Sequence, residues 1–231
     1  MKYLQSTRLT VTVVLLLVVL LWDASGLDLR VMHWWGTSRG FALKSDPWLS
    51  GILHTRGQQA AMVVYLGMWL LVLRPVGPWR QLTRDTRMAA ALAVTASMIT
   101  ISVLKHFSLT SCPWELQEFG GPANYVSHWA WGVPDLGGGK CFPGGHASSA
   151  FGFLSACLPF LMAAEVRLQR LGWRLLAGVV LVGLVFGLTQ TMRGAHYPSH
   201  TLWSAWICWS VGLTVYQQAA TRKGLAASPA S

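Results

Sequence analysis

Charged residues are scarce in this chain: aspartate, glutamate, lysine and arginine make up only 11% of its 231 residues, against about 25% in an ordinary soluble domain. Acidic residues are the scarcest, with 8 against 18 lysines and arginines. Hydrophobic residues make up 53% of the chain, and 13 residues are tryptophan, which favours the membrane–water interface. This composition argues against a soluble domain and indicates an integral membrane protein.

The chain also lacks a nucleic-acid-binding motif and an internal repeat, although its formal net charge of +10 would suggest a nucleic-acid partner in a soluble protein. Its basic residues flank apolar runs, so we interpret them as topology signals and contacts to lipid headgroups. The length suggests one domain, residues 1–223. The small, polar tail at 224–231 is expected to be disordered.

A membrane-spanning helix needs roughly 20 mostly apolar residues. Five runs of this kind are clear and a sixth, rich in tryptophan, is weaker: 9–22, 59–73, 88–104, 146–164, 171–190 and 201–216. Lys2 and Arg8 would also suit a signal peptide, but no small-x-small cleavage site follows the first run, so we favour a retained helix. We therefore expect an all-α bundle of six transmembrane helices, with a short interfacial helix within 28–43.

Charge predicts the orientation of this bundle. Most of the basic residues lie before the first run, between runs two and three, between runs four and five, and after run six. The positive-inside rule places these segments, and so both termini, in the cytoplasm. The other three connections would face outward, and they hold the polar motifs.

Three polar clusters stand at the outward ends of runs three, four and five. A Pro-Gly-Gly turn at 143–145 precedes His146, where the unpaired N–H groups of a helix start can bind an anion. Lys105 adds a positive charge and Arg193 adds a forked donor suited to phosphate. His146 and His196 would supply a nucleophile and a proton donor near neutral pH. These residues predict a phosphate site that needs no metal ion or cofactor.

The clusters resemble the motifs of the type 2 phosphatidic acid phosphatases, which share a core with vanadium haloperoxidases. Those motifs read K-x6-R-P, P-S-G-H and S-R-x5-H-x3-D. The matching segments here, over roughly 87–217, are Lys105 with Cys112-Pro113, Pro143-Gly144-Gly145-His146, and Arg193-Gly-Ala-His196-Tyr-Pro-Ser-His200. The resemblance implies a six-helix membrane bundle of the phosphatase and haloperoxidase type.

The resemblance also implies a mechanism in which His196 attacks phosphorus to form a phosphohistidine and His146 protonates the leaving oxygen. The groups implied to hold the phosphoryl oxygens are Lys105, Arg193 and the backbone of Gly144 and Gly145. The implied substrate is a lipid phosphate in the bilayer: undecaprenyl pyrophosphate, phosphatidylglycerol phosphate, phosphatidic acid or lipid A. The implied location is a bacterial inner membrane, with the site facing the periplasm.

Four positions depart from the family pattern, namely Cys112 and Gln190 in place of arginines, Gly144 in place of serine, and His200 in place of aspartate. His200 would orient His196 as a neutral imidazole, or is simply a polar residue at a helix start. The carboxylates that could replace it are Glu115, Glu118 and Asp135. We expect no catalytic role for the remaining histidines, which are His33, His54, His106 and His128.

These departures leave three interpretations of the activity: weakened hydrolysis, a phosphotransferase that moves a phosphoryl group from a polyprenyl pyrophosphate to lipid A, or a subfamily with rearranged donors. We favour the third, because both motif histidines and the lysine are intact. A non-catalytic lipid-binding relative is the remaining alternative.

The four cysteines fall into two kinds. Cys112 and Cys141 lie in the same outward connection, and a periplasm is oxidising, so we predict a disulfide that ties the first motif to the second. Such a bond typically contributes ~2–4 kcal/mol. Cys157 and Cys208 lie within apolar runs and are expected to be buried packing residues.

Overall fold

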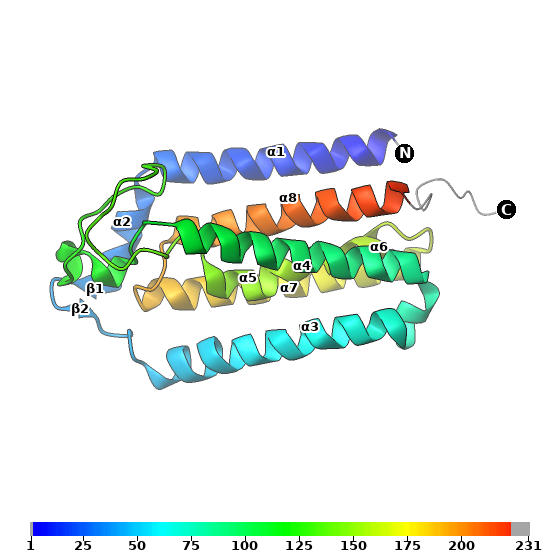
Figure 1. Cartoon of the computed structure of the whole chain (residues 1–231), viewed down its shortest axis with the longest axis horizontal. Coiled ribbons are helices and arrows are strands. Elements are labelled where there is room, and N and C mark those ends of the chain that lie inside the picture. Colours follow the sequence, from blue (N-terminus) through cyan, green and yellow to red (C-terminus); the bar gives the residue numbers. More distant parts are fainter. Residues whose placement is uncertain (1, 223–231) are drawn as a thin grey trace.

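The computed structural model describes residues 2–222, with side chains from 8 to 221. Within this part the chain forms a bundle of six helical rods (Figure 1): α1 (Lys2–Ala24), α3 (Gly57–Leu73), α4 (Arg84–Phe107), a broken rod of α5 (Gly145–Phe151), η5 (Gly152–Cys157) and α6 (Leu158–Leu161), α7 (Val166–Met192) and α8 (Pro198–Arg222). The expected all-α bundle is confirmed. The tail at 224–231, expected to be disordered, lies outside the described residues.

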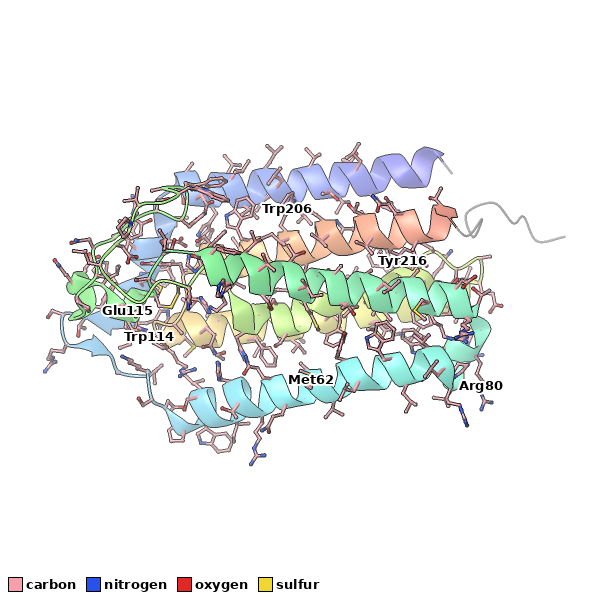
Figure 2. All side chains as sticks on the ribbon, viewed as in Figure 1. Met62, Arg80, Trp114, Glu115, Trp206 and Tyr216 are labelled. Atoms are coloured by element: carbon pink, nitrogen blue, oxygen red, sulfur yellow. A yellow bond between two sulfur atoms is a disulfide. The ribbon has the colours of Figure 1, made fainter. Side chains whose placement is uncertain are left out.

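Three helices of the described chain are long and apolar enough to cross a membrane: Trp48–Gln81, Arg84–Phe107 and Val166–Met192. The beginning of α1 and the end of α8 lie at one end of the bundle, together with the 3-10 helix η2 (Gly77–Gln81) that joins α3 to α4 (Figure 1). Arg80 marks this end in Figure 2, while Trp114 and Glu115 lie at the opposite end. The basic connections and the polar motifs are therefore separated by the length of the bundle.

The second rod begins earlier than the hydropathy of 59–73 suggests. A π-helix, η1 (Trp48–Arg56), runs directly into α3. The Oδ1 atom of Asp46 accepts hydrogen bonds from the backbone N–H groups of Trp48 and Leu49, at 3.0 and 2.9 Å, as a helix N-cap does. The extension brings Leu53 and His54 to the level of the polar motifs.

The fourth rod is not the continuous helix expected over 146–164. It changes to 3-10 geometry at Gly152, where a Cβ atom would stand 3.1 Å from side-chain atoms of Met98 on α4. Pro159 is the second residue of α6, and it has no backbone N–H to continue the helical hydrogen bonds. The close approach of α4 and the missing donor explain the break.

A face of α8 attaches α1 to the bundle. The indole N–H groups of Trp206 and Trp209 donate to the carbonyl and hydroxyl oxygens of Thr12, at 3.1 and 2.9 Å. Trp203 donates to Oδ2 of Asp23 at 2.8 Å. The three tryptophans are spaced three residues apart and therefore form one helix face, which contacts α1.

A compact cap covers the end of the bundle that carries the motifs (Figure 1). It contains α2 (Leu27–Met32), the antiparallel strands β1 (Gly36–Thr37) and β2 (Gly40–Phe41), and the 3-10 helices η3 (Pro113–Glu115) and η4 (Gln117–Phe119). The prediction of a short helix within 28–43 is therefore confirmed only for the first part of that segment. A Cβ at Gly36 would meet Phe41 and Phe119 within 3 Å, so glycine permits the hairpin to pack there.

Candidate functional site

His196 lies in the tight turn between α7 and α8. Gly194 adopts a φ of +74° in this turn, and the backbone N–H groups of Ala195 and His196 both donate to the carbonyl of Gln190, at 2.8 and 3.3 Å. The His196 side chain is only 7% exposed. Burial lowers its pKa well below the ordinary value, and the nearby charge of Lys105 acts in the same direction. The ring is therefore neutral near pH 7, the form in which a nitrogen lone pair can attack.

Lys105 lies in the last turn of α4 and reaches the start of α5. A Cβ at Gly145 would stand 3.3–3.7 Å from the end of the Lys105 side chain, including Nζ at 3.7 Å. Glycine at this position lets the lysine lie against the helix start. The first and second motifs are thus brought together, as expected.

His146 is buried at the start of α5. Its Nε2 lies 3.0 Å from the carbonyl oxygen of Leu53 in η1, which makes Nε2 the protonated nitrogen because a carbonyl only accepts. Its ring stacks on His54, with centroids 4.6 Å apart, and makes a tilted contact with Phe186 at 4.4 Å. Its Nδ1 is buried without a hydrogen-bond partner. The hydrogen-bonding capacity of this second nitrogen is therefore unused in the structure.

His54 lies next to the candidate site, a position that the sequence patterns do not predict. The apolar run begins near Gln59, so hydropathy alone assigns His54 to a connection. A signal is present in Asp46-Pro47, because an N-cap residue followed by proline is typical of a helix start.

Arg193 and Gln190 lie together at the C-terminal end of α7. Nη1 of Arg193 donates to Oε1 of Gln190 at 3.1 Å, and Nε donates to the carbonyl of Lys44 at 3.0 Å. The guanidinium also lies 5.9 Å from the ring centroid of Trp114. Burial lowers the pKa of Arg193, although arginine stays charged. The Nε2 of Gln190 is buried and unpartnered, which leaves a donor free beside the arginine.

Of the two motif glycines, Gly144 already has a partner for its backbone N–H, because it donates to the carbonyl of His200 at 3.1 Å. The carbonyl of Gly144 accepts from Ser204 at 2.9 Å. Gly144 therefore ties α5 to α8, which departs from the expectation that its N–H would hold a phosphoryl oxygen. Gly145 begins α5 and remains a helix-start donor.

His200 does not orient His196, contrary to the first expectation. It is fully buried, its Nδ1 lies 3.0 Å from the carbonyl oxygen of Cys141, and its ring centroid is 5.8 Å from that of His196. The Nδ1–H group is thus directed at a backbone carbonyl. The Nε2 of His200 is buried without a partner.

The three carboxylates considered as substitutes are occupied elsewhere. Asp135 accepts from the backbone and hydroxyl of Ser111. Glu115 accepts from the backbone N–H of Cys112, and Glu118 pairs with His33 at 2.7 Å. None of the three is therefore the partner of His196, because their oxygens are held by the cap.

The predicted disulfide between Cys112 and Cys141 is present. The Sγ of Cys141 lies 3.4 Å from Nδ1 of His196. The two sulfurs and a nitrogen of His196 lie within 4.8 Å of one another, a spacing that metal ligands also show. Because the sulfurs are bonded to each other, they offer no thiolate to a metal ion. Cys157 and Cys208 are buried and free, as expected.

An apolar cleft of about 810 Å³ opens between α3 and α4 and reaches the start of α5. Residues of α3 and α4 such as Met62 (Figure 2) and Ile99 line its length, and Gly145 and Ser149 lie at its inner end. His106 also lines it and contacts Phe107 edge-on. The cleft joins the bundle surface to the helix start that Lys105 covers.

His128 has a packing role. Its Nε2 lies 3.2 Å from Oδ2 of Asp23, and its ring stacks on Phe142 with centroids 4.3 Å apart. It therefore joins the end of α1 to the cap.

A family model described as the PAP2 superfamily matches residues 86–223, more than half of the chain. The matched segment contains all three motifs and excludes α1, α2 and α3. No curated protein and no solved structure gives a significant match to the chain.

Proposed function

The chain belongs to the PAP2 superfamily, and on that premise we propose that it is a membrane phosphatase that removes phosphate from a lipid phosphate or lipid pyrophosphate. Family membership indicates activity on phosphate esters. The observation that carries the lipid proposal is the apolar cleft between α3 and α4, which ends where Gly145 lies against Lys105.

The proposed reaction has two steps. The neutral ring of His196 attacks phosphorus through Nε2, and the bond from phosphorus to the leaving oxygen breaks as that oxygen takes a proton from His146. Water then attacks the phosphorus of the phosphohistidine and gives its proton to His146. The bond from phosphorus to Nε2 of His196 breaks, and inorganic phosphate is released.

The contacts of His146 suggest which of its nitrogens moves the proton. Nε2–H is held by the carbonyl of Leu53, so the unpartnered Nδ1 is the atom that exchanges a proton with substrate. A bound phosphate dianion favours the protonated ring, since an opposite charge nearby stabilises it.

Four groups would hold the phosphoryl oxygens: the ammonium of Lys105, the guanidinium of Arg193, the amide of Gln190 and the helix start at Gly145. Two of them carry positive charge, which stabilises the charge that develops in the transition state. Gln190 is added to the expected set because its buried Nε2 lacks a partner.

The cleft supports a lipid substrate because an acyl or prenyl chain would lie against apolar side chains while its phosphate reached the polar inner end. The separation of the basic connections from the site supports an outward-facing site by the positive-inside rule. The disulfide agrees with an oxidising compartment such as the periplasm. We therefore propose a bacterial inner-membrane enzyme with both termini in the cytoplasm.

Phosphate release by the purified protein tests this function. The panel contains undecaprenyl pyrophosphate, phosphatidylglycerol phosphate, phosphatidic acid and lipid A, each with EDTA present. We expect release from at least one lipid, indifferent to EDTA and lost in His146→Ala and His196→Ala. Phosphate release that persists in both variants would contradict the proposed active site. The absence of release from every lipid would contradict the proposed phosphatase function.

The low exposure of His196, 7%, favours a phosphotransferase as the second candidate, because a nucleophile shielded from water would keep its phosphoryl group for another acceptor. Transfer of label from a polyprenyl pyrophosphate to lipid A would then exceed phosphate release. Binding of lipid with neither release nor transfer would identify the non-catalytic relative.

A further inference from the structure

Cys141 contacts both histidines of the third motif. Its Sγ lies 3.4 Å from Nδ1 of His196, and its carbonyl oxygen lies 3.0 Å from Nδ1 of His200. Its backbone N–H donates to the carbonyl of Thr110 at 2.9 Å, and its side chain is bonded to Cys112. A fully buried residue with these restraints has little freedom to move relative to the α7–α8 turn.

The carboxylates of the cap do not compete for Nδ1 of His196. Asp135, Glu115 and Glu118 are bound within the cap, and His200 faces the Cys141 carbonyl. Sulfur is therefore the side-chain acceptor within hydrogen-bond distance of this nitrogen, and the backbone of Cys141 also interacts with the ring. Sulfur is a weak hydrogen-bond acceptor, but in a rigid position it suffices to distinguish one ring orientation from another.

We propose that Cys141, held in place by its disulfide to Cys112, is the positioning residue for His196 and takes the place of a carboxylate. This proposal rests on the proposed function, because it takes His196 as the nucleophile. Nδ1–H points at the sulfur, so the lone pair of Nε2 is the one presented to phosphorus. The sulfur makes and breaks no bond during the reaction.

The replacement has an electrostatic consequence. The titratable groups that face His196 are Lys105 on α4, His146 on α5, His54 on η1 and His200 on α8, and none of these four carries negative charge. A neutral sulfur adds none either. A carboxylate at position 141 would favour the protonated ring, so the acid limb of the activity profile would move to higher pH.

The test compares variants that all lack the disulfide. Cys112→Ala/Cys141→Ala removes the sulfur, and Cys112→Ala/Cys141→Asp places a carboxylate near the same nitrogen. We expect the first to lose kcat by about 10- to 100-fold, as misplacement of a reacting group does, with KM changed much less. The second should recover at least about tenfold of that loss and shift the acid limb upward. A purely structural role for the cross-link would affect both variants equally.

Two controls accompany these variants. Cys157→Ala/Cys208→Ala keeps only the disulfide pair, so it should match the native kcat. We expect this variant and the native protein to lose activity equally on reduction with dithiothreitol. Thermal unfolding in detergent compares the stabilities of the two cross-link-deficient double variants. If neither double variant folds, reduction of the native protein is the second measurement, and unchanged kcat after complete reduction overturns the proposal.

Modification of His196 by diethyl pyrocarbonate, followed by mass spectrometry across pH, gives a readout without substrate. We expect the pH midpoint of modification to be higher in Cys112→Ala/Cys141→Asp than in Cys112→Ala/Cys141→Ala. Equal midpoints with equal kcat, or native kcat in the alanine double variant, overturn the proposal. If no lipid is hydrolysed, the proposed function fails, while the modification profile still decides whether residue 141 controls His196.

Discussion

The rings of His54 and His146 lie nearly parallel, with 26° between their planes and 4.6 Å between their centroids. One comes from the π-helix η1 and the other from the start of α5. Together with the carbonyl of Leu53, which holds Nε2 of His146, this stack fixes the plane of the imidazole proposed as the acid. The segment 48–56, outside the part of the chain that the family model matches, therefore contributes to the site.

Replacing His54 tests that contribution. His54→Ala removes the stacking surface, so we expect kcat to fall by about tenfold, a loss comparable to that of one aromatic contact of ~0.5–1.5 kcal/mol. His54→Phe keeps the flat surface and should stay within about threefold of the native kcat. Steady-state kinetics on the best lipid substrate measure both. An equal loss in the two variants would show that His54 acts through its nitrogens instead.

Replacing His146 and replacing His196 should have different effects on kcat when the leaving group of the substrate changes. His146→Ala should lower kcat by about 10²–10⁴-fold on a lipid phosphate, because protonation of the leaving alkoxide is lost. With p-nitrophenyl phosphate, whose leaving group needs no proton, most of this loss should disappear. His196→Ala should stay inactive on both substrates, and activity of His196→Ala on p-nitrophenyl phosphate would contradict its role as nucleophile.

Stability should depend on pH through His196. Because burial lowers its pKa in the folded protein, the unfolded chain binds a proton more readily below pH of about 6.5. Folding stability is then fully present above that pH and falls as the pH decreases, by up to about 1.4 kcal/mol per pH unit.

Thermal unfolding in detergent between pH 5 and 8 measures this dependence. His196→Gln should show a shallower loss of unfolding temperature at acid pH than the native protein. His106→Gln, which removes an exposed histidine, is the control and should keep the native slope. Identical slopes in all three proteins would contradict the prediction.

Replacing each of two glycines of α7 by alanine should have opposite effects on the stability of the fold. A Cβ at Gly183 would overlap the ring of Phe151, whereas a Cβ at Gly178 would meet nothing within 4 Å. We expect Gly183→Ala to destabilise the fold by about 1–3 kcal/mol through overpacking. Gly178→Ala should be neutral or stabilising by up to about 1 kcal/mol, because alanine favours helix. The unfolding midpoints of the two variants, each compared with that of the native protein, measure these effects.

Filling the cleft should affect lipids selectively. Ile99 on α4 lines the cleft and is 57% exposed, so Ile99→Trp should raise KM for a long-chain lipid phosphate several-fold and leave p-nitrophenyl phosphate unaffected. Leu92→Trp, on the same helix outside the cleft lining, is the matched control and should change neither KM. Equal effects on both substrates would place the lipid chain elsewhere.

Several features of this protein follow from patterns that are local in the sequence. The apolar runs predict the rods because a helix in a bilayer must be about 20 residues long and apolar wherever it lies. The positions of Lys105, His146 and His196 predict that they share one end of the bundle, because each stands at an end of an apolar run that is expected to face outward. The Cys112–Cys141 pair follows from the shared connection of the two residues.

Other features depend on contacts that no local pattern contains. The break in the fourth rod depends in part on the approach of Met98 to Gly152, and the hairpin depends on Phe119 packing over Gly36. Hydropathy misses His54 because an N-cap by Asp46 extends a helix beyond its apolar run.

The sequence by itself determined the all-α bundle, the family and most of the candidate site residues, because these depend on composition, period and order along the chain. Only the tertiary structure decided what each of those residues contacts. It directed His200 to a carbonyl and placed a disulfide sulfur beside His196. The physical reason is that hydrogen-bond partners are chosen by distances of about 3 Å between distant segments, and only the packed bundle sets those distances.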